Sequence, residues 1–315
     1  MRLRSLQVVL LLLATGCSMH TQAIRRDFAD YNQTIHYNNS QQMLLNLVRL
    51  KYRETPLFME VGALSASYDV SGNFELGAGR ISDANAISGE VGGRFSARPT
   101  ITYTPLSGEM YVKRVLAEID PETFILLVHS GWPVDVLCHV IVEKISGNQN
   151  NEDEESYSQF QELVQVLAEA QDGGRLRFLK DSGHGVVIEV KTTRGDIFGG
   201  TQTPEPSTHL LPIKDILFRS LLDLMFFLGK NTDVPEKHLD QVRSGRTNGW
   251  LNIRHHSSAP DDALVTVRHN GYYFSIARND IRTKDTFALL KLLFALQAGD
   301  IETVQPILTL PVAGP

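Results

Sequence analysis

A long stretch of strict two-residue alternation constrains this chain more than any other feature. From Leu64 to Ala78 the even-numbered positions are apolar or small, and the residues between them are mostly polar. After the turn-like Ser82-Asp83-Ala84-Asn85, the alternation resumes in the opposite parity from Ile87 to Tyr103. A period of two is the pattern of a strand with one apolar face, and each arm far exceeds the usual strand of about five or six residues. The sequence therefore predicts one long β-hairpin with an apolar and a polar face.

Two structures fit such a hairpin. Transmembrane strands alternate in the same way and carry aromatic residues toward their ends, as this hairpin does at Tyr68, Phe74, Phe95 and Tyr103. One hairpin cannot span a membrane alone, because its edges would leave backbone groups unsatisfied, so several protomers would each have to contribute one. In the other structure, the apolar face packs on the protein's own helices.

The first seventeen residues predict where the chain is delivered. Met1 to Arg4 is a short basic start, the run from Leu6 to Ala14 is apolar apart from Gln7, and small residues precede Cys17. These are the regions of a secretory signal peptide. The apolar run is too short to remain as a helix across about 30 Å of hydrocarbon.

The segment Ala14-Thr15-Gly16-Cys17 resembles the lipobox of bacterial lipoproteins, although Ala14 stands where that family more often has leucine. The resemblance implies that the signal is cut before Cys17 and that this cysteine is acylated, with fatty acids such as palmitate. Ser18 follows where lipoproteins retained in the inner membrane typically carry aspartate, so the resemblance implies the outer membrane. An ordinary signal peptide with an incidental cysteine is the alternative.

Composition narrows the classes of partner. The chain has 315 residues, of which 42% are hydrophobic and 21% charged, as in globular proteins. Its formal net charge is −6, and loss of the signal removes two further arginines. An acidic chain without a long basic stripe is not expected to bind nucleic acid. Membrane attachment then depends on acyl chains at Cys17, since two or more chains give stable anchoring.

The sequence divides into four segments. These are a signal peptide over 1–16, an N-terminal anchor and helical segment over 17–56, the hairpin over 57–106 and a body over 107–315. Helical periodicity runs through 23–54, with an expected break at Asn38-Asn39-Ser40 and an end before Pro56.

The body combines helical and strand patterns. Helices are predicted over 108–118, 121–130, 156–171, 213–228 and 284–298. Strands are predicted over 134–145, 175–180 and 185–193, with a loop over 195–208, a solvated acidic loop over 147–155 and a hairpin around Asn270-Gly271. This order predicts an α+β fold, in which N-terminal helices and the long amphipathic hairpin precede helices packed on a small mixed or antiparallel sheet.

Residues that could carry chemistry are few. The sequence has no nucleophile elbow, P-loop, His-Glu-x-x-His or CxxC motif, so we expect no catalytic residues and no cofactor. Cys138 lies in the apolar run 136–142 and is expected to be buried and inert, with His139 on the opposite face of a strand. Arg49, Lys51 and Arg53 fit a salt-bridged or solvated face better than an anion site.

The adjacent pair His255-His256 could share a metal ion only if a turn brought them together with Asp261 or Asp262. Surface histidines without ligand spacing are usually not ligands, so we expect no metal site.

Four stretches of the chain beyond the signal resemble a group of bacterial lipoproteins to which no activity or site residues are assigned. They are Leu44–Tyr52, Pro99–Leu106, Thr286–Leu290 and Leu308–Pro311. The resemblance implies a common fold.

Together these features predict a non-enzymatic outer-membrane lipoprotein that acts through contacts with other proteins of the bacterial envelope. Its body would face the periplasm. The alternative is a protomer of an oligomeric outer-membrane channel that contributes its hairpin, 64–103, to a shared barrel. A third hypothesis, that the chain is a hydrolase of the envelope, is not supported by any residues of the sequence.

Overall fold

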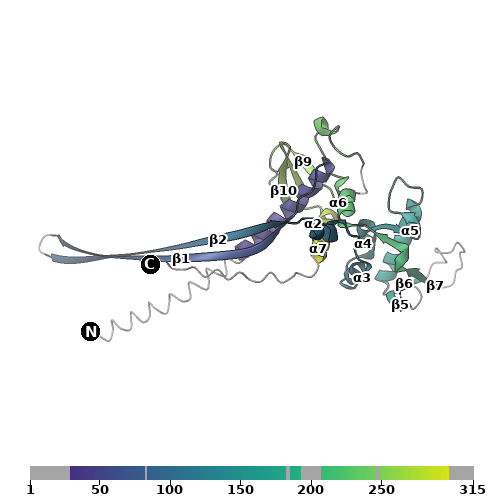
Figure 1. Ribbon diagram of the computed structural model, residues 1–315, viewed down its shortest axis with the longest axis horizontal. Helices are drawn as coiled ribbons and strands as arrows, with labels where there is room; N and C mark the ends of the chain where they lie inside the picture. Colours follow the sequence, from purple (N-terminus) through teal and green to yellow (C-terminus); the bar gives the residue numbers. More distant parts are fainter. Residues whose placement is uncertain (1–28, 82–83, 182–184, 193–206, 246–248, 298–315) are drawn as a thin grey trace. The chain divides into compact units, whose positions relative to one another are not determined.

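A computed structural model describes residues 29–81, 84–181, 185–192, 207–245 and 249–297 (Figure 1). It confirms the α+β class, because helices alternate with small antiparallel sheets. Among the described residues, 57–106 form one compact unit, the hairpin. Residues 29–56 and 107–297 form the other unit, so the body of the structure also includes the N-terminal helical segment. The predicted signal, Cys17, most of the predicted loop over 195–208 and the C-terminal tail lie outside the described residues.

The hairpin unit contains the predicted pair of long strands. β1 (Met59–Ile81) pairs antiparallel with β2 (Ala84–Pro105) along its whole length (Figure 1), from Met59 opposite Pro105 to Ile81 opposite Ala84. The register shifts once, between Val61 and Ala63. Both strands are longer than the alternation predicted.

The body begins with a single helix over residues 29–51. The predicted break at 38–40 is wrong, because Ser40 is buried and its Oγ donates to the carbonyl of His36, 2.9 Å away, inside the helix. The helix ends where Arg53 takes a φ of 64°. The amide of Glu54 then bonds the carbonyl of Arg49 at 2.8 Å, which satisfies a carbonyl of the last turn.

The next helices match the sequence in part. α2 (Gly108–Tyr111) continues as a π-helical turn, η1 (Val112–Leu116), and α3 (Pro121–His129) is capped by Asp120 as expected. The strand predicted over 134–145 is wrong for most of its length. Its first eight residues form α4 (Val134–Ile141), and the remainder forms β3 (Val142–Ile145). A short apolar run does not by itself distinguish a buried helix from a buried strand.

Two small antiparallel sheets follow. One has the order β4-β3-β8, with β4 at Asn148–Gln149 and β8 at Ile216–Phe218. The other has the order β5-β6-β7 and lies beside α5 (Tyr157–Asp172), with its strands at Leu176–Asp181, Gly185–Thr192 and Ser207–Pro212. The helix predicted over 213–228 is wrong in its first half. There η2 (Ile213–Asp215) and β8 precede α6 (Leu221–Gly229).

The third sheet of the described body has the order β10-β11-β9, with its strands at Ala263–His269, Tyr272–Ala277 and Arg254–His256. Asn270 and Gly271 both have positive φ, as the predicted two-residue hairpin turn requires. η3 (Glu236–His238) precedes this sheet, and α7 (Ile281–Leu296) follows it. Several small antiparallel sheets therefore replace the one sheet expected from sequence.

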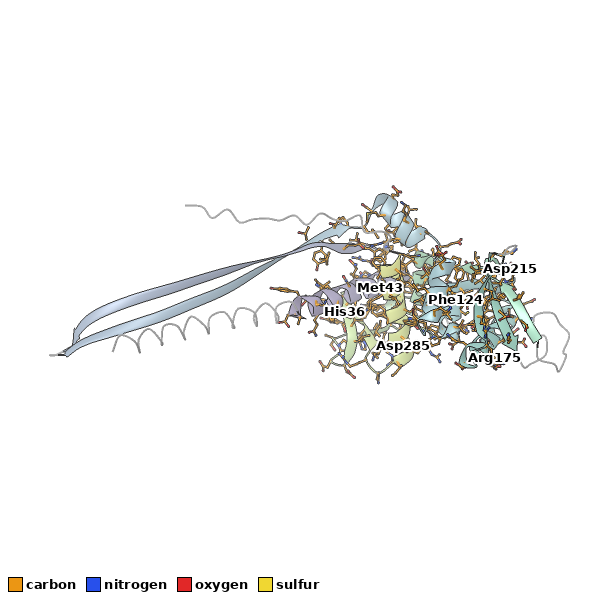
Figure 2. All side chains as sticks on the ribbon, turned by 90° about the horizontal axis from the view of Figure 1, so that it is seen from below. His36, Met43, Phe124, Arg175, Asp215 and Asp285 are labelled. Atoms are coloured by element: carbon orange, nitrogen blue, oxygen red, sulfur yellow. The ribbon has the colours of Figure 1, made fainter. Side chains whose placement is uncertain are left out.

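The core of the body is aromatic and aliphatic. Phe124, Phe160, Phe274 and Phe287 are all less than 2% exposed. Figure 2 places Phe124 and Met43 among the side chains of the body. Because these residues come from helices and strands distributed over the whole body, they join its helices and three sheets into one unit.

Candidate functional site

The hairpin is the first candidate site. Its register pairs the apolar set of one arm with that of the other, as in Leu64 opposite Ile101 and Phe74 opposite Val91. Residues directly opposite each other in an antiparallel ladder belong to the same face of the sheet. The two alternations seen in the sequence therefore combine into one ribbon, with an apolar set on one face and a polar set on the other.

Among the described residues, no further strand pairs with either long edge of this ribbon. Within the described chain, its sheet contains β1 and β2 alone. An isolated two-stranded hairpin is marginally stable in water, and an open edge is a template for pairing with another strand. The hairpin thus has the properties of an assembly surface.

The cysteine of the body is buried, as predicted, but on a different element. Cys138 lies on α4 and is fully buried, and burial raises the pKa of its thiol, so it stays protonated and unreactive. His139 does not lie opposite it across a strand. Its ring stacks on Trp250 with 4.9 Å between centroids, and its Nδ1 lies 2.8 Å from the carbonyl of Asp135.

The two adjacent histidines have separate partners. In β9, Nδ1 of His255 lies 2.9 Å from Oδ2 of Asp233, whereas Nε2 of His256 lies 2.9 Å from Oγ of Ser275. Asp262 pairs instead with Arg278. In the part of the chain that the structure describes, no three His, Cys, Asp or Glu side chains group as metal ligands.

Of the three basic residues near the end of the first helix, Arg53 is exposed as expected, Arg49 is half-buried and Lys51 is buried. Lys51 is 7% exposed, and its Nζ donates to the carbonyl of Lys230 at 2.7 Å. Arg53 donates to the carbonyl of Val242 at 3.3 Å. These contacts hold the end of the helix against the segment that follows α6.

The sequence did not reveal a second candidate, the histidine–tyrosine cluster of Tyr52, His238, His269, Tyr272 and Phe274. Tyr52 follows the first helix, His238 ends η3, and the other three come from β10 and β11. The hydroxyl of Tyr52 lies 2.8 Å from Nδ1 of His238. Its ring meets those of His269 and Phe274 edge-on, at 5.1 and 6.0 Å between centroids.

Electrostatics show what the histidine–tyrosine cluster can do. Burial raises the pKa of Tyr52 to about 12, so its hydroxyl stays protonated at neutral pH, where it lies within hydrogen-bond distance of Nδ1 of His238. Burial also lowers the pKa of His269, against the opposing effect of Glu54, whose Oε1 lies 3.2 Å from Nε2. The cluster therefore packs aromatic and imidazole rings that hold the first helix to the third sheet, and it keeps the Tyr52 hydroxyl protonated.

No local signal identifies this cluster, because Tyr52 and His238 are 186 positions apart in the chain. Each residue alone has the appearance of an ordinary aromatic or polar position. The three-dimensional fold creates the cluster.

Comparisons with protein-family models, with curated proteins and with solved structures found no match for this chain. None of the helices in the described ranges is long and apolar enough to cross a membrane.

Proposed function

We propose that this chain is a non-enzymatic outer-membrane lipoprotein that acts through protein contacts in a bacterial envelope assembly, with the hairpin as its contact element. Acyl chains on Cys17 attach it to the membrane, and the body lies in the periplasm. The observation that carries the proposal is the two-stranded ribbon β1–β2, which forms a unit of its own and has no third strand among the described residues.

The attachment is tested by changing the cysteine. Cys17→Ser is expected to leave an unprocessed precursor and to abolish labelling with a clickable fatty acid. Cys138→Ala is the matched control, because it removes the cysteine in α4 and leaves the signal untouched; it should mature and label normally. Normal maturation of Cys17→Ser would refute the lipoprotein assignment.

The contact element is tested in cells by photo-crosslinking. A photoreactive residue at position 71 in β1 is expected to capture protein partners, whereas the same residue at Glu162, exposed on α5, is the control. Capture from position 162 alone would place the contacts on the body and contradict the proposal.

A second candidate function is supported by the length and register of the ribbon. The apolar alternation of about fifteen residues in each strand is about 50 Å long, and at a tilt of about 45° it would cover about 35 Å. This exceeds the apolar band of about 25 Å that transmembrane strands present. Several copies, each giving one hairpin, would then form an oligomeric channel of the outer membrane.

Light scattering with size exclusion separates the two candidates. The full-length lipoprotein in detergent is compared with a shortened variant, in which Ser67 joins its ladder partner Arg98 through Asn-Gly. A defined oligomer that the shortened variant loses would support the channel. A monomer in both samples would exclude a channel of pooled hairpins and leave contacts with other proteins.

A further inference from the structure

We infer that the partner of the hairpin is a second copy of this chain, joined head to tail. The outer edge of β1 in one copy pairs antiparallel with the outer edge of β2 in the next. This inference rests on the proposed function in two respects, namely that the hairpin makes the contacts and that all copies are anchored to one membrane.

The first argument is the condition of the β1 edge. Natural edge strands block unwanted pairing with proline, lysine or bulges. From Ala63 to Ile81, β1 contains no proline and no lysine, and its pairing with β2 runs without a register shift. This regular stretch of β1 lacks proline, lysine and bulges, although it carries Asp69, Glu75 and Arg80. Because β2 contains Pro99, opposite Ala66, β1 is the less protected of the two edges.

The second argument is symmetry, since two copies can meet edge to edge in three kinds of contact, two between like strands (β1–β1, or equally β2–β2) and one between unlike strands. A two-fold axis perpendicular to the sheet makes β1 antiparallel to β1 but points the hairpins in opposite directions. A two-fold axis along the strands makes β1 parallel to β1 and turns the apolar faces to opposite sides. In the head-to-tail contact β1 meets β2, the pairing stays antiparallel and the apolar faces coincide.

The chain connections between the hairpin and the body select among these contacts. The body joins the hairpin at one end, next to the pair Met59 and Pro105, through residues 56 and 107. Copies anchored to one membrane need their bodies at the same end of the hairpins. Among the three contacts, the head-to-tail one combines this requirement with antiparallel pairing and a common apolar face.

The charges along the two strands favour the same contact. The polar set of β1 carries Asp69 and Glu75, whereas that of β2 carries Arg94, Arg98 and Glu90. In the ladder, Asp69 lies opposite Ser96, between the two arginines of β2, whereas Glu75 lies opposite Glu90. Outside the polar set, β1 also carries Arg80. A β1–β1 contact would place like charges together, while a β1–β2 contact between copies joins a more acidic edge to a more basic one.

Head-to-tail contacts have a consequence for assembly. Because each copy presents two different edges, the contact repeats from copy to copy until a ring closes, or else it continues as a filament. Ring closure leaves no open edge on any hairpin. The expected product in detergent is therefore an oligomer of fixed size.

Disulfide crosslinking between differently tagged copies tests the edge assignment. In a Cys138→Ala background, one copy carries Ser71→Cys in β1. The other copy carries one cysteine in the polar set of β2, at position 88, 92, 96 or 100. Four positions are tested because the β2 residue that lies opposite position 71 of the neighbouring copy is not known in advance. The full-length lipoprotein is assembled from both copies in detergent and oxidised with copper phenanthroline. A Ser71→Cys/Arg94→Cys double variant, whose cysteines are ladder partners, reports whether the hairpin itself is formed.

We expect mixed-tag dimers at one or two neighbouring β2 positions, several-fold above the other positions, with few dimers between two Ser71→Cys copies. Predominant Ser71–Ser71 dimers in an oligomeric sample would overturn the head-to-tail contact and leave the hairpin as the contact element. An oligomer with no crosslink in the scan would also overturn it. A monomeric sample with a correctly formed hairpin would overturn the inference together with the channel.

Discussion

At the scale of single residues, two buried polar side chains, Arg219 and Asn150, stabilise the point in the body where α4 ends and β3 begins. Arg219 is 5% exposed, donates to the carbonyls of Val140, Val142 and Asn150, and lies with its guanidinium 4.1 Å from the centre of the Phe227 ring. The side-chain amide of Asn150 donates to the carbonyls of Cys138, His139 and Val142. Together they satisfy carbonyls at the end of α4 that would otherwise be buried without partners.

Replacing Arg219 tests this account. Arg219→Met removes the side-chain donor to the buried carbonyls of Val140 and Asn150, so the free energy of unfolding should fall by about 3–5 kcal/mol. Asp223→Asn is the control. It removes the ion pair to Nε of Arg219, 3.2 Å away, but Asp223 is 53% exposed, so the loss should stay below about 1 kcal/mol. Urea unfolding followed by circular dichroism measures both; equal losses would show that the carbonyl contacts contribute little.

Asn150 allows a second comparison at this scale. Asn150→Asp replaces a buried donor with a carboxylate that faces three carbonyl oxygens, so we expect a loss of about 3 kcal/mol or more. The control is Asn151→Asp, at the next residue. It keeps the oxygen Oδ1 that accepts from the amide of Asp153, so the free energy of unfolding should hardly change. Similar unfolding midpoints for the two variants would contradict the role assigned to Asn150.

At the scale of elements, the sequence predicted what is decided locally and missed what tertiary contacts decide. The alternation predicted β1 and β2, Asn270-Gly271 predicted the turn between β10 and β11, and Asp120-Pro121 predicted the start of α3. The run 134–141 became a helix whose end is satisfied by Arg219, a residue about eighty positions away. The histidine–tyrosine cluster depends on contacts over a still longer separation, 186 positions between Tyr52 and His238, so no local pattern could indicate it.

Two histidines, His269 in β10 and His139 in α4, predict that the stability of the body depends on pH. Burial lowers the pKa of His269 and of His139 below the ordinary value of 6.5, although Glu54 and Asp135 oppose the effect. Arg49 and His238 near His269, and Arg282 near His139, act in the same direction as burial. Because the unfolded chain then binds protons at higher pH than the folded one, the free energy of unfolding should fall as the pH drops below about 6.5.

Urea unfolding at pH 7.5 and pH 5.0 measures this dependence. Each of the two histidines can contribute at most about 1.4 kcal/mol per pH unit. His269→Gln should reduce the difference in stability between the two pH values, because it removes a group whose pKa folding lowers. If His269→Gln leaves the difference in the free energy of unfolding unchanged, protonation of His269 does not cause the pH dependence.

At the scale of the whole molecule, the body and the hairpin differ in what stabilises them. The body encloses a core of buried phenylalanine and aliphatic side chains, among them Phe124, Phe160 and Phe287. The hairpin is a ribbon of two strands, and such ribbons need further contacts to be stable in water. The source of those contacts decides between a hairpin that belongs to the protein's own fold and one that belongs to an assembly.

The stability of the body distinguishes these cases. If the apolar set of the hairpin packs in an assembly, the variant that joins Ser67 to Arg98 should lose the oligomer. Both proteins are prepared without the signal and Cys17. The unfolding midpoint of the shortened variant should then equal that of the parent protein within experimental error. If that set packs on the protein's own helices, the same cut exposes their apolar surface and removes about 25 cal/mol of stability for each Å² uncovered. A lower unfolding midpoint would therefore refute the assembly function, because one apolar face cannot serve both purposes. Loss of the oligomer with an unchanged midpoint would show that the hairpin serves the assembly and that the body folds without it.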